Sequence, residues 1–430
     1  MARDLDRREW LLATSALGAG AIAFAVGGGG CDHAGGTRDA AAAVLEPSHE
    51  ALIVAVWARR ARAATVAVRA GDAPAVLREL AFGASGSAAV DIGGLAPGAG
   101  YEIVVTLDDG TSLAPLRGRL APDPADARPV RLAVVADIDP NPDFDTDICA
   151  HLLAAEPDLL VGLGDFPYTD NGPIAETLEV YRERHAAIRV HPPIRALLDA
   201  MPLRAIYDDH EFRNNWDAMF VAAEPARYAA AVAVWDEFFP VRAPAGEVRY
   251  RSWRHGAHVE CFLLDCRRFR SANAAADGPG KTMLGDAQRA WFLDALARST
   301  ATWKLVFTSV PLDFGNGVDH WRGFLSERDA LFDAIVAAPI TGIAFFSADQ
   351  HWFASHRHTF GIREFMSGPL ARGIATPDAT PPGVLFHAER FNALLVDASP
   401  DALVVTGLGE GGERFFEERL TVADLTPART

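Results

Sequence analysis

The segment "AIYDDHEFRNNWD", residues 205–217, sets two aspartates, a histidine and a glutamate directly after an apolar stretch. Acids follow apolar stretches elsewhere in the same way, after "VRLAVVA", "PDLLVGLG" and "GIAFFSA". Neighbouring carboxylates repel one another, and burying them without a counter-charge is unfavourable, so these residues predict a bound cation. The residues concerned are Asp137, Asp139, Asp165, Asp208, Asp209, Asp349 and His351.

The elements that must position these side chains alternate between strand and helix from Val130 onward. A strand is expected directly before each of these acids. Helices are expected within 145–156, 178–189, 228–239, 286–298 and 327–337. Such alternation indicates an α/β fold with parallel strands, whose carboxyl ends face one crevice. One aspartate after a strand is often a helix cap, but four strand ends bearing acids favour a shared metal site.

A site with at least five carboxylates and an imidazole suits a pair of metal ions. Two ions need one carboxylate that bridges them, ligands on either side, and a position for water. Asp165 follows the central predicted strand and is the expected bridge. A metal pair would lower the pKa of this water toward neutrality and neutralise negative charge that develops on a reacting group.

The region before Val130 has a different pattern. Residues 44–122 contain short alternating strands with Gly and Pro turns, which predicts a small all-β sandwich. The stretch "VDIGGLAPGAGYEIVVTL" resembles fibronectin type III and immunoglobulin-like domains. The predicted organisation is therefore an export signal and flexible linker at 1–43, this β domain at 44–122, and a catalytic domain at 130–421.

The N-terminus has the features of an export signal. Arg7 and Arg8 precede an apolar stretch of about 16 residues, too short to span a bilayer comfortably. The pattern resembles the twin-arginine type and predicts export to the periplasm, cell surface or exterior. Small residues before Cys31 resemble a lipoprotein cleavage site, so Cys31 is either a lipid anchor or an incidental thiol in a flexible linker.

Net charge constrains the partners of the chain. The formal charge of −17 repels polyanions, so no nucleic-acid partner is expected. A phosphate site in this chain must create its positive charge locally, as metal ions would. The sequence carries no signal for an oligomeric state.

The acid-bearing motifs carry a family resemblance. "ADID", "GLGD", "DDHE" and "SADQH" resemble the motif series of calcineurin-like metallophosphoesterases, whose fold is a β-sandwich flanked by helices. "GDFPY", "YDDHEFRNN", "LDCRRFR" and "SADQH" are similar to the PhoD-like alkaline phosphatase/phosphodiesterase family within that group. The likeness covers roughly Val130 to Gly368. It implies a metal-dependent hydrolase of phosphate esters.

The resemblance also implies a role for each matching residue. Asp137, Asp139 and His351 would bind the first metal, Asp165 would bridge, and Asp209 and Asp349 would bind the second. Tyr168 matches a tyrosine that can bind Fe³⁺ as phenolate. His210 takes the place of the histidine that touches phosphate, and Asp208 is expected to orient His210 by a hydrogen bond.

Departures from the family pattern bear on the metal. The cysteine common near the end of the first strand is absent from "VVADID", Ser309 stands in "SVP" where histidine is expected, and Asp349 replaces another histidine. Carboxylates in place of imidazoles favour hard ions such as Ca²⁺, Mg²⁺ or Mn²⁺. Tyr168 favours Fe³⁺.

Other polar residues are candidates for the substrate. Asn214, Arg267 and Arg270 could contact phosphate; alternatively, the arginines form a structural ion cluster and the asparagine caps a turn. His356 and His358 alternate on a strand and are either pocket or core residues. Two functional alternatives stay open: a catalytically degenerate cell-surface binding protein, and a diesterase specific for lipid, teichoic acid or nucleotide.

Overall fold

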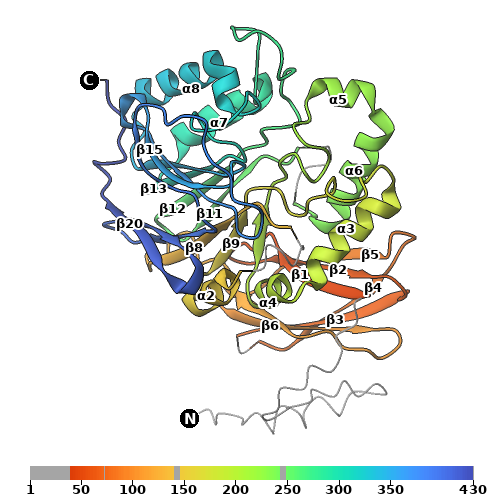
Figure 1. Ribbon diagram of the computed structural model, residues 1–430. Coiled ribbons are helices and arrows are strands. Elements are labelled where there is room, and N and C mark those ends of the chain that lie inside the picture. The colour runs from red at the N-terminus through yellow and green to blue at the C-terminus, as the bar shows by residue number, and fades with distance from the viewer. Residues whose placement is uncertain (1–38, 72, 140–145, 243–247, 430) are drawn as a thin grey trace, which may run out of the picture. The chain divides into compact units, whose positions relative to one another are not determined.

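The computed structural model describes residues 39–71, 73–139, 146–242 and 248–429. The predicted export signal, with Arg7, Arg8 and Cys31, lies outside the described residues. Within these ranges, no helix is both long and apolar enough to cross a bilayer. The fold is a mixed α/β arrangement with several sheets, as predicted (Figure 1).

The largest sheet has nine strands and contains the three that carry the first acids. β8, β9 and β10 lie side by side and parallel at its centre, and β10 also pairs in parallel with β1. In order across the sheet the strands are β20 (Arg414–Leu420), β19 (Leu403–Leu408), β18 (Ala393–Ala398), β8 (Val130–Val135), β9 (Leu159–Gly162), β10 (Leu203–Ala205), β1 (Ala40–Leu45), β2 (Leu52–Ala58) and β5 (Ser87–Ile92).

A seven-stranded sheet packs against the nine-stranded one. Its inner strands β12, β13, β14 and β16 run parallel. Buried side chains of both sheets, such as Val161, Phe307 and Phe346, form one apolar layer between them. The strands are β11 (Arg251–His255), β12 (Val259–Leu263), β13 (Trp303–Phe307), β14 (Ile343–Ser347), β16 (Arg363–Met366), β15 (Phe353–Arg357) and β17 (Val384–Ala388).

Helices cover the outer faces of the two large sheets, each over its own apolar cluster (Figure 1). On the nine-stranded sheet these are α2 (Ile148–Ala155), α3 (Leu178–Val190), α4 (Pro192–Ala200), α5 (Ala218–Ala223) and α6 (Pro225–Phe238). On the seven-stranded sheet they are α7 (Gly285–Arg298) and α8 (Leu325–Ala337). Short 3-10 turns occur at Trp321–Phe324, Thr359–Gly361 and Glu410–Gly412.

The N-terminal strands form a sandwich that shares its larger sheet with the rest of the fold. β1, β2 and β5 pack on a four-stranded sheet of β4 (Val76–Ala81), β3 (Ala63–Ala70), β6 (Gly100–Leu107) and β7 (Leu116–Arg119). β1 begins at Ala40, four residues before the expected start of the β domain. The division into a fibronectin-like and a catalytic domain stays a prediction.

Glu46, at the end of β1, fastens this part to the centre of the fold. Its buried carboxylate accepts hydrogen bonds from Arg204 Nη1 of β10 (2.6 Å) and from Arg251 Nε and Nη2 of β11 (3.0 and 2.5 Å). Burial raises the pKa of Glu46, but the neighbouring arginines hold that pKa below its ordinary value. The ion cluster therefore links strands of both large sheets.

Candidate metal centre

The carboxyl ends of strands from both large sheets meet at one place. β8, β9 and β10 lead into Asp137, Asp165 and Asp209, while β14 of the other sheet leads into Asp349 and His351. Sequence spacing alone predicted the convergence of these side chains, and the groups of ligand atoms described below bear it out.

Left-handed backbone marks the turns that aim these side chains. Asp137, Asp165, Asp349 and His351 have φ angles of 57°, 55°, 81° and 61°, which non-glycine residues rarely adopt. Residues held in such conformations cluster at functional sites, where the surrounding structure enforces them. Gly164 (φ 105°) lets the turn after β9 approach the next strand, because a Cβ there would lie 2.5 Å from the backbone nitrogen of Asp208.

One group of ligand atoms consists of Asp137, Asp165 and His351, with one atom of each within 4.8 Å of the others. Both carboxylate oxygens of Asp137 and Oδ2 of Asp165 are buried without a hydrogen-bond partner among the described residues. His351 Nδ1 donates to the carbonyl of Gly373 (2.7 Å), so its Nε2 carries the lone pair and accepts from Tyr168 Oη (2.9 Å). An imidazole fixed in this way is typical of a metal ligand.

A second group consists of Asp208, Asp209 and Asp349, and a third connects Asp165, Asp209 and His210. Asp165 thus belongs to the first and third groups, as a bridging residue must. Oδ1 of Asp209 is also buried without a hydrogen-bond partner in the described part of the chain. Burial and neighbouring carboxylates raise the pKa values of Asp165 and Asp349 well above their ordinary range. Buried oxygens without hydrogen-bond partners and carboxylates that repel one another would both be stabilised by cations at this site.

Asp139 lies outside these groups, and its role as a ligand of the first metal stays a prediction. Its Oδ2 accepts from Asn171 Nδ2 (2.9 Å) and lies 3.8 Å from Arg372 Nη1. Residues two apart on a strand share a face, but the left-handed φ of Asp137 interrupts the strand before Asp139. Asp139 is consequently directed to other partners.

His210 is oriented by Asp170 and not, as predicted, by Asp208. His210 Nδ1 donates to Asp170 Oδ1 (2.6 Å), and the His210 ring lies 4.2 Å from the ring of Tyr168. Burial lowers the pKa of His210, but Asp209 and Asp170 raise it to about 9. Asp170 stands five residues after Asp165 in "GDFPYTD", and no motif considered in the sequence singled it out.

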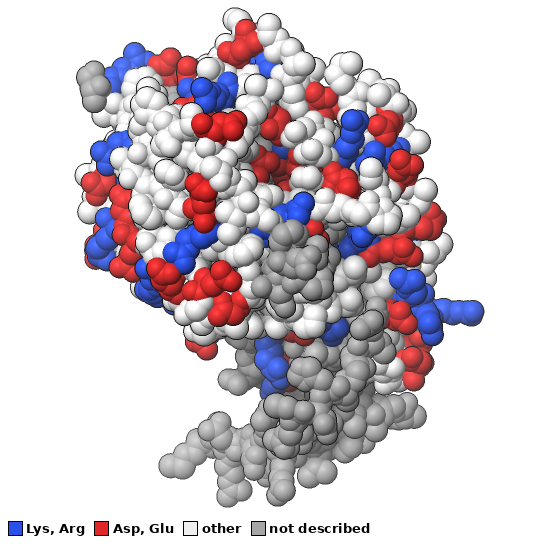
Figure 2. All heavy atoms as spheres, viewed as in Figure 1, with Lys and Arg blue, Asp and Glu red and all other residues white. Residues whose placement is uncertain are grey.

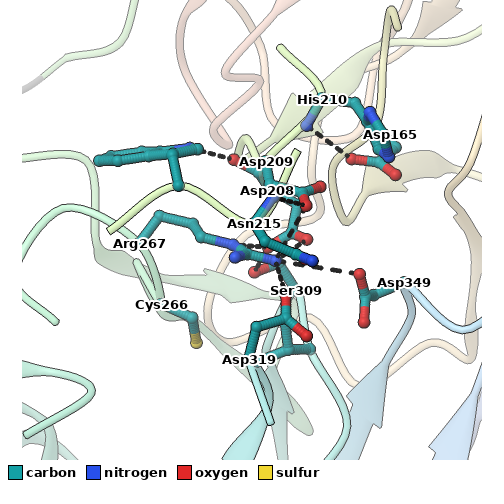
Figure 3. Close-up of polar contacts among 12 residues, drawn as sticks. Asp165, Asp208, Asp209, His210, Asn215, Cys266, Arg267, Ser309, Asp319 and Asp349 are labelled. Atoms are coloured by element: carbon teal, nitrogen blue, oxygen red, sulfur yellow. Dashed lines mark hydrogen bonds and ion pairs between the residues drawn. The ribbon is translucent and has the colours of Figure 1, made fainter. Parts of the chain in front are cut away.

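Asp208 is instead bound to Arg267, as Figure 3 shows. Arg267 Nε and Nη2 donate to the two oxygens of Asp208 (2.8 and 2.6 Å), and Ser309 Oγ donates to Asp208 Oδ1 (2.5 Å). Arg267 Nη2 also lies 3.0, 3.6 and 3.9 Å from oxygens of Asp319, Asp209 and Asp349. This guanidinium is fully buried and supplies fixed positive charge among the acids.

The predicted phosphate contact of Arg270 does not fit the structure. Arg270 is buried, and its nitrogens donate to the carbonyls of Cys266 (2.6 Å) and Asp319 (2.7 Å), to Asn273 Oδ1 and to Met283 Sδ. Its side chain braces the loop that holds Arg267. The structural ion cluster, the alternative weighed for both arginines, describes Arg267, whereas Arg270 donates to neutral acceptors.

The two asparagines after the histidine differ in position. Asn214 is exposed, and its backbone N–H donates to Asp170 Oδ2 (2.7 Å). Asn215 points into the acid cluster (Figure 3), where its amide nitrogen, correctly oriented, lies 2.6 Å from Asp319 Oδ2. A substrate contact of Asn214 stays a prediction.

An open cavity of about 490 Å³ adjoins the acids. Acidic side chains are visible in a hollow on the face shown in Figure 2. The cavity is lined by Asn215, Asn273, Asn316, Gly317, Val318, Asp319, Asp349 and Gln350. Neutral amides thus surround the route to the carboxylates.

Comparisons with known proteins show the family and the fold of the chain. Residues 144–411 match the PhoD-like phosphatase family. Alkaline phosphatase D of Bacillus subtilis (strain 168) is 28% identical over 255 residues, which are 48% of this chain and 44% of the relative, so the match spans less than half of that protein.

Two solved structures share the fold. The structure of PhoD superposes with a TM-score of 0.77 at 19% identity, over 89% of this chain and 88% of that one. Purple acid phosphatase PPD1 from yellow lupin seeds has a TM-score of 0.66 at 12% identity, over 90% of this chain and 77% of the other. The family match covers well over half of the described residues, and the chain belongs to the PhoD-like phosphatase family.

Proposed function

We propose that this chain is an exported, metal-dependent hydrolase of phosphate esters. The observation that carries the proposal is that buried carboxylate oxygens without hydrogen-bond partners, which follow separate strands, lie together in adjoining ligand groups, as far as the structure describes the chain. Export rests on the twin-arginine pattern at Arg7 and Arg8.

The residues present fit two cations. Asp137, His351 and Tyr168 would hold one ion, Asp209 and Asp349 the other, with Asp165 between them. Such ions supply Lewis acidity toward a phosphoryl oxygen and lower the pKa of water. Carboxylate-rich ligands favour Ca²⁺, Mg²⁺ or Mn²⁺, and Tyr168 favours Fe³⁺.

His210 would act as the general acid that gives a proton to the substrate. Its Nδ1–H is committed to Asp170, so Nε2 is the ring nitrogen that can present a proton to an ester oxygen. The Asp170 carboxylate holds the ring in this orientation. Donation to the leaving oxygen or to a nonbridging phosphate oxygen would follow.

Arg267 and the cavity prepare the site for an anionic substrate. The Arg267 guanidinium offsets part of the charge of Asp208, Asp209 and Asp319 without facing solvent. The neutral amides around the cavity add no charge that would repel a phosphate ester. Its volume leaves room for a second ester group, which supports diesters as well as monoesters.

Hydrolysis of p-nitrophenyl phosphate and of bis(p-nitrophenyl) phosphate tests this function after reconstitution with Mn²⁺, Ca²⁺ or Fe³⁺. Turnover by the wild type is expected, with loss in Asp137→Asn and retention in the control Asp286→Asn, whose side chain is 93% exposed. A wild type that binds metal but turns over neither ester would support the alternative of a degenerate binding protein.

A further inference from the structure

We propose that Asp313, His356 and His358 form a second metal site that binds one divalent transition-metal ion such as Zn²⁺. One ligand atom of each residue lies within 4.8 Å of the others. None of the three belongs to the ligand groups of the metal centre among the described residues. The site is therefore independent of the proposed hydrolase activity.

The fold brings the three residues together from two strands of the seven-stranded sheet. His356 is in β15 and His358 is the residue directly after that strand, two positions after His356, so their side chains share one face. The two rings lie 3.9 Å apart between centroids. Asp313 is in the segment that follows β13. Figure 1 shows β13 and β15 in the same sheet.

Hydrogen bonds fix which ring nitrogens are available to a metal. His356 Nε2 lies 3.1 Å from the carbonyl of Pro382, and His358 Nε2 lies 2.8 Å from Glu364 Oε2. Because a carbonyl and an ionised carboxylate only accept, each Nε2 carries a hydrogen, and in the neutral ring each Nδ1 holds a lone pair. His356 Nδ1 is buried and has no hydrogen-bond partner within the ranges that the structure describes.

The surroundings resemble the support that metal-binding histidines receive. A metal-ligating imidazole usually donates its other N–H to a carboxylate or a backbone carbonyl, as both rings do here. Glu364 is itself held by Leu312 N (2.8 Å) and Ser347 Oγ (2.6 Å). These bonds fix the orientation of the His358 ring without any metal.

Charge and access are also compatible with an ion. The side chain of Asp313 is 25% exposed, which provides a path from solvent, while the His358 side chain is only 3% exposed. Arg328 Nη1 lies 3.7 Å from Asp313 Oδ2, close enough to offset part of the carboxylate charge. Asp313 Oδ1 is then the oxygen more available to a metal.

The donor set identifies the class of ion. Two imidazoles and one carboxylate form a set that Zn²⁺ accepts in proteins, with water as a fourth ligand. Mg²⁺ and Ca²⁺ prefer sets made mainly of oxygen, so the chemistry differs from that of the metal centre. An ion here would tie β15 to the segment after β13.

Zinc content measured by elemental analysis tests the proposal in the full chain. The protein is stripped with chelator, loaded with Zn²⁺ and dialysed, all in an Asp165→Asn background that weakens binding at the metal centre. The addition of His358→Ala should remove one zinc equivalent per chain. The control His151→Ala, a partly exposed surface histidine paired with Asp147, should remove none.

Loading with Co²⁺ gives a second readout, since four-coordinate Co²⁺ absorbs visible light strongly. That absorption should be lost in His358→Ala. If this variant does not fold, Asp313→Asn at the more exposed position replaces it with the same expectation. Equal metal content and equal Co²⁺ spectra in the background, the site variants and the control would overturn the proposal.

Discussion

Replacing Arg267 by methionine should strongly destabilise the protein in the presence of chelator. Methionine keeps much of the side-chain volume but removes the guanidinium charge. Two hydrogen bonds to Asp208 and one to Asp319 are lost with it. Removing one partner of a buried ion pair costs about 3–5 kcal/mol, because the other charge stays buried without compensation. Arg267 is fully buried, so solvent screening does not reduce this figure.

The assay is urea unfolding followed by tryptophan fluorescence, compared among single and double variants. Asp208→Asn removes the other charge, so Arg267→Met/Asp208→Asn should lose less than the sum of the single losses, with a coupling of about 2–3 kcal/mol. The control Arg414→Met removes an exposed pair with Glu417, worth about 0–1 kcal/mol. An Arg267→Met protein as stable as the control, or strict additivity, would refute the reasoning.

Two further predictions concern other ion pairs. Glu46→Gln should cost about 3–5 kcal/mol at neutral pH, because it leaves Arg204 and Arg251 without their carboxylate. Since the folded pKa of Glu46 is depressed, its contribution to stability is present above its ordinary value of 4.5 and is lost as pH falls. Urea unfolding should therefore show the difference between variant and wild type shrinking as pH falls below 4.5, and a difference that stays constant would contradict this. Asp170→Asn should lower kcat for p-nitrophenyl phosphate by about 100-fold with metal content unchanged, because His210 loses its orienting carboxylate; loss of metal instead would show that Asp170 supports the ions.

Much of the centre could be predicted from the sequence because its chemistry follows strand ends. A run of apolar residues that ends in an acid places that acid at the end of a strand. Parallel strands then bring all such acids to the same edge of the sheet. Asp137, Asp165, Asp209 and His351 accordingly lie where they were expected. Helices were also located well, for example α3 at Leu178–Val190 against an expected 178–189.

The remaining features depend on contacts between distant loops. Nothing local to Asp170 or Asp319 indicates that one meets His210 and the other Arg267. The expectation that Asp139 binds the first metal came from the family resemblance of its motif, which does not show the left-handed φ at Asp137. A positive φ at an aspartate has no sequence signal comparable to glycine.

Local sequence patterns also could not predict that the N-terminal strands join the central sheet. β1 and β10 are separated by more than a hundred and fifty residues, as Leu45 and Leu203 show, and pair over a single position of the register. Alternating apolar residues predict that a strand exists but not which neighbour it joins. The strands before Val130 therefore look like a separate sandwich in sequence, whereas three of them extend the central sheet.

Metal equivalents per chain in wild type and Asp165→Asn test the central claim most directly. Elemental analysis of protein purified without chelator should show about two equivalents fewer in the variant, because Asp165 belongs to two of the three ligand groups at the centre and would lie between the two ions. The control Asp286→Asn should match the wild type. If Asp165→Asn keeps the full metal content of the wild type, the carboxylates at these strand ends do not share a pair of ions.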